Sequence, residues 1–256
     1  MRTFLWLVLL VLVAAPADGQ RRRRGRDAPP RNMDWKSYNV PYNGQFTFAR
    51  LRYQEEGWAC MAQGMPGWAH DYPRGERHFA KIVSEVTLVD TRRDESNILT
   101  LDDPELFKYP VAYLSEPGCW AMNDGELEGL RAYLGKGGFL IVDDFSNQDW
   151  YQFEQQMFLA FPDLRPIRLN ASHPIFDAFF HIETLDNFVH PYNWGVPEFH
   201  GYFENNDPNQ RMMVIVNYNN DIGDYWEFSD TGWVPIDLTN EAYKLGVNYL
   251  IYGMMR

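Results

Sequence analysis

Acidic residues follow two apolar segments in the middle of the chain, where their types and spacing suit the binding of a ligand. The apolar runs are Val111–Leu114 and Phe139–Val142, each with the length and composition of a buried strand. In open parallel sheets, ligands bind beyond the carboxyl ends of the strands. We therefore predict a candidate binding edge formed by the residues that follow these runs, namely Glu116, Pro117, Gly118, Asp143 and Asp144.

Two carboxylates that meet at such an edge would repel each other, which raises the pKa of one of them or attracts a cation. Successive residues of a strand point to opposite faces, so only one of Asp143 and Asp144 can face a given pocket. We expect the other to cap the following helix beside Ser146 and Asn147. The alternative is an acid/base role for Glu116 and the two aspartates in a hydrolase.

The two cysteines, Cys60 and Cys119, leave two possibilities open. Cys119 follows Gly118, but the second glycine of a Gly-x-Cys-x-Gly nucleophile turn is absent, so we do not expect a catalytic thiol. In an exported chain the two cysteines are candidates for a disulfide bond. Two free thiols remain the other possibility.

No short motif in the sequence predicts a metal or cofactor. The six histidines have none of the spacings of a zinc site, and they are His70, His78, His173, His181, His190 and His200. The segment Asn219–Asp224 resembles a calcium loop in composition but lacks the EF-hand pattern, so we interpret it as a turn. Gly135–Gly138 follows a helix and precedes a strand, the reverse of the order in a phosphate-binding loop. The expected cofactor is therefore none, and no metal ligands are predicted.

A strand–helix–strand unit positions the acidic residues. Between the two apolar runs, Glu126–Leu134 places leucines at helical spacing, and Asn123 three residues before Glu126 is typical of a helix start. Gly135 and Gly137 are expected to supply left-handed positions that end this helix. Such a unit implies a parallel sheet covered by helices on both faces.

Other elements are expected on both sides of this unit. The expected strands are Phe46–Leu51, Ile98–Leu101, Leu164–Leu169, Phe199–Glu204 and Met212–Val216; the expected helices are His78–Val86, Trp150–Phe161 and Asn240–Met254; short helical turns are expected at 102–104 and 173–176, and a long loop at Tyr53–Arg77. The order predicts an α/β fold with three layers and a mostly parallel sheet, flavodoxin-like or class I glutamine amidotransferase-like.

The amino-terminal part of the sequence has the features of an export signal. Arg2 precedes the apolar run Phe4–Ala14, and Ala15-Pro16-Ala17 has the small-x-small pattern of a cleavage site. We expect residues 1–17 to be a signal peptide, residues 18–45 a basic, proline-containing linker and lead-in, and residues 46–256 one α/β domain. The expected location is therefore periplasmic or secreted.

Composition limits the classes of partner. A net charge of −12 argues against nucleic acid as a partner. After signal cleavage we expect no transmembrane segment, because no later segment is apolar enough to span a bilayer. The partners that remain are a small molecule, a glycan or an envelope protein.

Five sequence segments together resemble the domain of unknown function 4159 family. They are Y-P-x-x-Y-L-x-E-P-G at 109–118, L-R-A-Y-L-x-x-G-G-F-L-I-V-D-D-F at 130–145, Ser172–Phe176, N-D-I-G-D-x-W-E at Asn220–Glu227 and L-G-V-N-Y-L-I-Y at Leu245–Tyr252. The resemblance covers the chain from about Phe46 onward. It implies a bacterial source and a fold similar to that of class I glutamine amidotransferases, but it implies no activity.

Two functions from different classes agree with these observations. The first is an exported, non-catalytic module that binds a ligand or takes part in assembly through the carboxyl edge of its sheet. The second is a degenerate or unrecognised hydrolase that uses the carboxylates at that edge. A hydrolase requires the carboxylates to converge with a histidine in one site, whereas a binding module does not.

Overall fold

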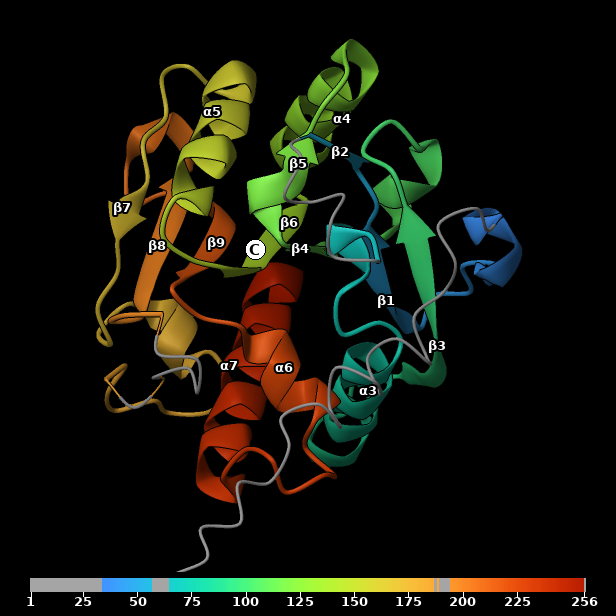
Figure 1. The fold of residues 1–256 in the computed structure, drawn as a ribbon, viewed down its shortest axis with the longest axis vertical. Coiled ribbons are helices and arrows are strands. Elements are labelled where there is room, and N and C mark those ends of the chain that lie inside the picture. Colours follow the sequence, from blue (N-terminus) through green and yellow to red (C-terminus); the bar gives the residue numbers. More distant parts are fainter. Residues whose placement is uncertain (1–33, 57–64, 187, 189–193, 256) are drawn as a thin grey trace, which may run out of the picture.

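In the computed structural model, which describes residues 34–56, 65–186, 188 and 194–255, the chain folds around one mixed sheet (Figure 1). Among these residues seven strands form the sheet in the order β3-β1-β4-β6-β9-β8-β7. The strands are β1 Phe46–Leu51, β3 Thr91–Leu99, β4 Val111–Ser115, β6 Phe139–Phe145, β7 Ile167–Arg168, β8 Glu198–Phe203 and β9 Met212–Tyr218. The expected α/β architecture with a mostly parallel sheet is confirmed.

The five strands at one side of the sheet are parallel. β1 pairs in parallel with β3 and β4, β4 with β6, and β6 with β9, whereas β8 is antiparallel to β9 and β7 is antiparallel to β8. Numbered along the chain, the parallel strands β1, β3, β4, β6 and β9 therefore lie side by side in the order 2-1-3-4-5. A second, two-stranded sheet pairs β2 Gln54–Glu55 with β5 Trp120–Ala121.

The direction in which the chain adds strands reverses between β1 and β4. From β1 the chain crosses to β3 on one side, and it then returns to place β4 on the other side of β1. The connections that leave the carboxyl ends of β1 and β4 therefore run to opposite faces of the sheet. In open α/β sheets, such a reversal of strand order is the usual place for a ligand.

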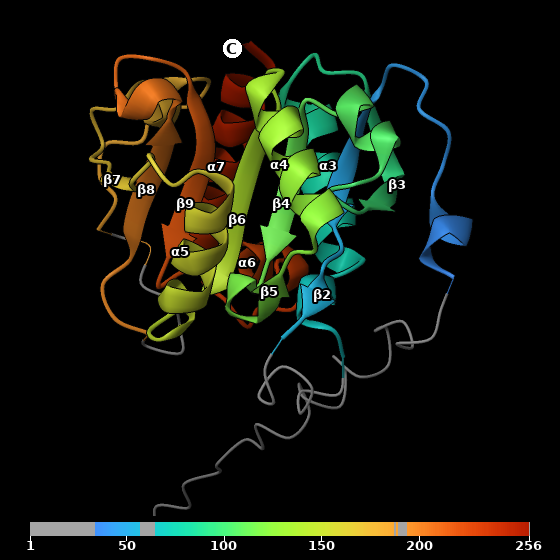
Figure 2. The ribbon, with the colours of Figure 1, turned by 90° about the horizontal axis from the view of Figure 1, so that it is seen from above.

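Helices cover both faces of the sheet, and Figure 2 shows α4 and α5 on one side of the strands with α3, α6 and α7 on the other. The helices are α3 Arg74–Val86, α4 Asp124–Gly135, α5 Asp149–Ala160, α6 Ile222–Glu227 and α7 Ile236–Met255. Short 3-10 helices occupy Trp35–Tyr38, Gly67–Ala69, Pro104–Lys108, Pro117–Cys119, Pro174–Asp177 and Glu204–Asn206. The arrangement has three layers and two hydrophobic cores, one on each face.

The central strand–helix–strand unit forms as the sequence predicts. β4 and β6 are parallel neighbours, and α4 begins with a capping box in which Asn123 and Glu126 each accept a hydrogen bond from the other's backbone N–H. One detail of the prediction is wrong. Gly137 has a φ of 106°, but Gly135 is the last residue of the helix and does not have a left-handed backbone.

Several element boundaries differ from the expected ones. α3 begins at Arg74, inside the segment predicted as a long loop, and that segment also contains β2 and a 3-10 helix. β3 begins at Thr91 rather than at Ile98, because the first part of this edge strand is largely exposed and needs no apolar pattern. The strand expected at Leu164–Leu169 is reduced to the two residues of β7.

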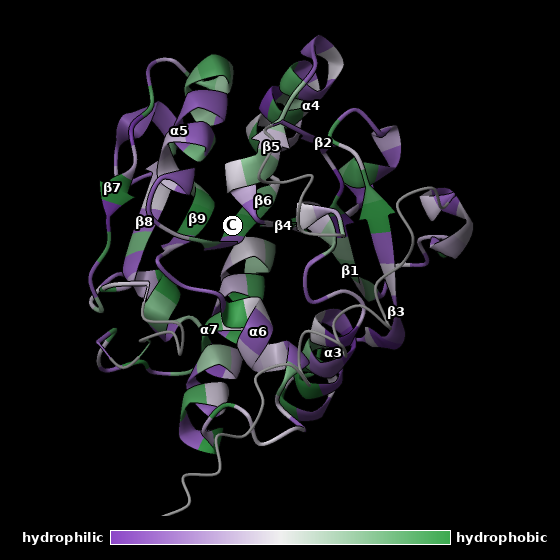
Figure 3. Ribbon diagram, viewed as in Figure 1, coloured by the Kyte–Doolittle hydropathy of each residue, from purple (hydrophilic) through white to green (hydrophobic). Residues whose placement is uncertain are grey.

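Coloured by hydropathy in Figure 3, helices such as α3 and α7 carry both hydrophilic and hydrophobic residues. The buried residues of α3 recur at helical spacing, as in other helices that border a core. Among the described residues, no helix combines the length and the apolar character needed to cross a bilayer. The predicted signal peptide at 1–17 and most of the predicted linker lie outside the described residues.

Candidate functional site

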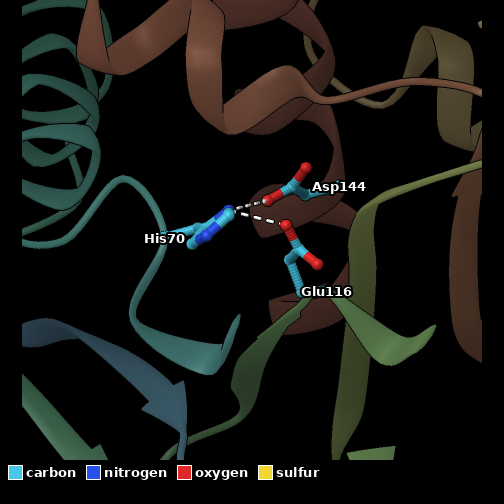
Figure 4. A group of neighbouring side chains, drawn as sticks. All are labelled: His70, Glu116 and Asp144. Atoms are coloured by element: carbon cyan, nitrogen blue, oxygen red, sulfur yellow. Dashed lines mark hydrogen bonds and ion pairs between the residues drawn. The ribbon is translucent and has the colours of Figure 1, made fainter. Parts of the chain in front are cut away.

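Three side chains from separate segments converge at the carboxyl edge of the sheet, as Figure 4 shows. His70 lies in the connection between β1 and α3, Glu116 directly follows β4, and Asp144 lies in β6. Nδ1 of His70 is 2.7 Å from Oε1 of Glu116 and 3.2 Å from Oδ2 of Asp144. His70 and Glu116 therefore lie in the connections that leave the carboxyl ends of β1 and β4, and Asp144 completes the group from β6.

The backbone at this group is held in an uncommon conformation. Asp71, Glu116 and Asp144 have φ values of 64°, 51° and 63°, in the left-handed region that residues other than glycine seldom adopt. At Asp144 the pairing of β6 with β9 is irregular, so the strand presents this residue out of register. The backbone N–H of Glu116 donates to the carbonyl of Asp143 at 3.2 Å, which fixes the start of its loop. Strained backbone of this kind concentrates at functional sites.

The charges in the group shift the pKa values of His70 and Glu116. Burial by itself would lower the pKa of His70, but the charge of Glu116 and the hydrogen bond to Asp144 outweigh it and hold the pKa of the imidazole well above its usual range. Burial and the neighbouring charge of Asp144 raise the pKa of Glu116. The side chains of His70 and Glu116 are 13% and 17% exposed, so the group is accessible from solvent, whereas that of Asp144 is 3% exposed.

Asp144 connects this group to further carboxylates. The hydroxyl of Ser115 donates to its Oδ2 at 3.2 Å. Its carboxylate also belongs to a buried set with Asp71 and Asp221, in which one oxygen from each residue lies within 4.8 Å of the others. Burial raises the pKa of Asp221 well above its usual range, and the charge of Asp144 adds to this effect. The edge therefore concentrates carboxyl groups whose charges repel one another.

A third set joins Asp71 to α6. Donor atoms of Asp71, Asp224 and Glu227 again lie within 4.8 Å of one another, and all three residues are buried. The backbone N–H of Asp224 donates to Oδ1 of Asp221 at 2.7 Å, so Asp221 caps the start of α6. Histidine and carboxylate donors arranged in this way are suitable ligands for a metal ion.

Asp143 belongs to a separate hydrogen-bond network, which reaches the first turn of α6. Its Oδ2 accepts hydrogen bonds from the hydroxyl of Tyr113 at 2.7 Å and from the N–H of Gly223 at 3.0 Å, and its Oδ1 accepts from Nδ2 of Asn217 at 3.0 Å. The two adjacent aspartates thus face different surroundings. The expectation that one of them caps the helix beside Ser146 is wrong, because Asp143 binds the first turn of α6 instead of α5.

Burial raises the pKa of Asp143 to about 7, and the charge of Asp144 acts in the same direction, while the hydrogen bond from Tyr113 opposes it. Asn217 is itself held by the hydroxyl of Tyr249, which donates to its Oδ1 at 2.9 Å. Asp143 is therefore the centre of a buried polar network that ties β4, β6 and β9 to α6.

The remaining residues of the predicted edge have packing roles. Pro117 and Gly118 lie in a 3-10 helix after β4. A Cβ atom at Gly118 would lie 2.5 Å from the side chain of Asp149, so only glycine allows α5 to approach this turn. Cys119 is buried in the same turn, and the predicted pairing with Cys60 stays a prediction because Cys60 lies outside the described residues.

Sequence reasoning missed several residues of this edge, namely His70, Asp71, Asp221, Asp224 and Glu227. The sequence predicts a turn at Asn219–Asp224 and a family motif at Asn220–Glu227, and the spacing of the acidic residues in this motif is the signal that points to the site. No local spacing could reveal His70, because its partners lie on distant segments of the chain.

The arrangement differs from a serine hydrolase triad. Ser115 is fully buried and donates to Asp144 rather than to His70. A nucleophile of this class must contact the base that activates it. The group is thus suited to holding a cation or to moving a proton through His70 and Glu116.

The chain matches a protein-family model over most of its length. The family model described as "Domain of unknown function (DUF4159)" matches residues 47–254, which is most of the chain. No curated protein matches the chain.

Proposed function

The chain belongs to the DUF4159 family, and because the description of that family names no activity, we propose a function from the site alone. The protein is a binding module that holds a cationic ligand at the carboxyl edge of its sheet. The convergence of His70, Glu116 and Asp144 on one point carries this proposal. It develops the expectation of a non-catalytic ligand-binding protein.

An excess of negative charge supports a cationic ligand. The carboxylates of Glu116 and Asp144 share one imidazole, and Asp71 and Asp221 lie beside Asp144. Buried carboxylates that meet in this way repel one another, and a bound cation would relieve the repulsion. An anionic ligand would add to it.

The place of the site in the fold supports the same proposal. His70 and Glu116 lie in the connections that leave β1 and β4, where the order of the strands reverses. The parallel order 2-1-3-4-5 is that of flavodoxin-like sheets, which bind their ligands at this reversal. We therefore also assign the domain to the flavodoxin-like architecture, with the amidotransferase-like group as a variant of it.

A thermal and calorimetric experiment tests the proposal. The untagged full chain, first freed of metal with a chelator, is titrated with spermidine, Ca²⁺ and Mn²⁺, and with sulfate at matched ionic strength. The cations should raise the melting temperature and sulfate should not. Glu116→Gln should weaken the effect, and the control Glu128→Gln, at an exposed position on α4, should leave it unchanged. If no cation raises the melting temperature above the matched salt control, the proposal fails.

A hydrolase is the second candidate, because the same convergence places a histidine between two carboxylates. His70 and Glu116, the more exposed members, would exchange protons with a substrate. Measurable turnover of ester, glycoside or phosphoester substrates that Glu116→Gln abolishes would favour this candidate over the binding module.

The proposal places the protein outside the cytoplasm, in the periplasm or secreted. The support is the signal-like segment at 1–17, followed by the basic stretch Arg21–Arg24. Sequencing the amino terminus of protein recovered from the producing cell should show a start at or near Asp18. An intact Met1 on cytoplasmic protein would contradict export.

A further inference from the structure

We propose that the ligand of this edge is a divalent transition-metal ion, such as Mn²⁺ or Zn²⁺, held by His70, Glu116 and Asp144. The inference rests on the proposed function and names the chemical class of its ligand. It starts from the donor atoms, since each of these residues offers one atom and the three atoms lie within 4.8 Å of one another.

The distances in the group match those between neighbouring ligands of a metal ion. Two donors about 2.1 Å from an ion and at right angles to each other are about 3.0 Å apart. Nδ1 of His70 lies 2.7 Å from Glu116 and 3.2 Å from Asp144, on either side of that value. An ion therefore fits between these atoms with small movements of the side chains.

The donor types select the class of ion. Carboxylates alone suit Mg²⁺ and Ca²⁺, whereas an imidazole nitrogen beside them favours Mn²⁺, Fe²⁺ or Zn²⁺. The metal thus explains the presence of His70, which a site for an organic cation would not require.

Other contacts hold the proposed ligands in place. Ser115 donates to the same oxygen of Asp144 that faces His70. The hydroxyl of Tyr53 donates to the backbone carbonyl of Glu116 at 2.6 Å, and the N–H of Cys119 donates to it at 3.0 Å. Outer contacts of this kind orient metal ligands and are part of functional metal sites.

The nearby carboxylates supply the charge that a dication requires. Glu116 and Asp144 balance the ion, and the carboxyl groups of Asp71 and Asp221 lie within reach of Asp144. Arg50 is paired with Glu76 on α3, and its charge also acts on Asp71, so it offsets part of the charge of that carboxylate. The carboxyl groups at this edge therefore outnumber the single positive charge that His70 can supply.

The test measures metal content and the identity of the bound donor. The untagged full chain is stripped with a chelator, loaded with Mn²⁺ or Zn²⁺ and desalted, and bound metal is counted by mass spectrometry. We expect one ion per chain, and electron spin echo spectroscopy of the Mn²⁺ form should detect a directly bound imidazole nitrogen. His70→Ala should remove the nitrogen signal and weaken binding at least about tenfold.

Matched variants separate this site from adventitious binding. His181→Ala removes a histidine that is 74% exposed and should leave both signals unchanged. Glu116→Gln keeps the size of a partly exposed side chain, and it should weaken binding even if His70→Ala fails to fold, which circular dichroism would reveal. Metal binding that is equal in His70→Ala and the wild type, or a loaded chain without retained metal, would overturn the inference.

The same samples distinguish the two proposals. If spermidine or Ca²⁺ stabilises the protein through Glu116 while Mn²⁺ and Zn²⁺ are not retained, the binding edge stands and the transition-metal site is wrong. If no cation binds, both proposals are wrong.

Discussion

Nδ1 of His70 lies 3.2 Å from Oδ2 of Asp144, a residue 74 positions further along the chain. The contact joins the connection after β1 to an irregular position in β6. It makes Asp144, which is itself buried, part of the partly exposed group at the sheet edge, while the preceding residue, Asp143, belongs to a separate buried network. The two adjacent aspartates should therefore respond differently to substitution.

Asp143→Asn should destabilise the fold and leave cation binding largely intact. The carboxylate accepts hydrogen bonds from Tyr113, Gly223 and Asn217, and an amide cannot accept from all three donors. We expect a loss of about 1–3 kcal/mol in the free energy of unfolding, measured by urea denaturation.

Asp144→Asn should show the reverse, with cation binding lost and stability unchanged or increased, because one charge leaves a crowded acidic edge. The control Asp163→Asn changes an exposed aspartate and should alter neither property. Equal loss of stability in the Asp143 and Asp144 variants, with binding unchanged in both, would show that the pair is structural.

Stability should fall as the pH rises from about 5.5 to 8 in the presence of a chelator. Burial raises the pKa of Asp143 to about 7, and the pKa values of Glu116 and Asp221 are also raised. Between the ordinary carboxyl pKa and these higher values, the folded chain binds more protons than the unfolded chain, so deprotonation favours unfolding. His70 acts in the same direction, since its stabilisation is full below its ordinary pKa and is lost as the pH passes the raised value.

The expected decrease in melting temperature over this range is on the order of 5 °C, measured by calorimetry. Asp143→Asn should make the dependence shallower. A melting temperature that rises towards pH 8 would contradict the proposed origin of these pKa shifts.

Gly223→Ala should damage the acidic edge from the side of α6. A Cβ atom at this position would overlap Oδ2 of Asp71 and lie 2.8 Å from the hydroxyl of Tyr113, so Asp71 must move. We expect a loss of about 1–3 kcal/mol in unfolding free energy, together with weaker cation binding. Gly135→Ala is the control, because a Cβ there meets nothing within 4 Å. Unchanged stability and binding in Gly223→Ala would show that the edge tolerates this displacement.

Cys60 and Cys119 should form a disulfide bond in the exported protein. Alkylation followed by intact-mass measurement, with and without reduction, should count no free thiols before reduction and two after it. The reduced protein should be less stable by about 4 kcal/mol on the chain-entropy model. Two reactive thiols in the unreduced exported protein would contradict the pairing.

The sequence alone determined the elements that form through interactions between residues close together in the chain. The capping box at Asn123 and Glu126, the apolar runs of β4 and β6, and the helical spacing of α4 depend on residues close together in the chain, and they form as predicted. The parallel pairing of β4 and β6 follows from the same unit, because a strand, a helix and a strand of these lengths have one common arrangement. The sequence also placed Glu116, Asp143 and Asp144 at one edge of the sheet.

The tertiary structure decided which of these residues act together. Alternation along a strand predicts that Asp143 and Asp144 face opposite ways, but not which of them meets His70. That choice depends on the irregular pairing of β6 with β9 and on the reversal of strand order between β1 and β4. Both are set by long-range packing of the chain. His70 and the acidic residues of α6 join the site for the same reason, since contacts between distant segments leave no local pattern in the sequence.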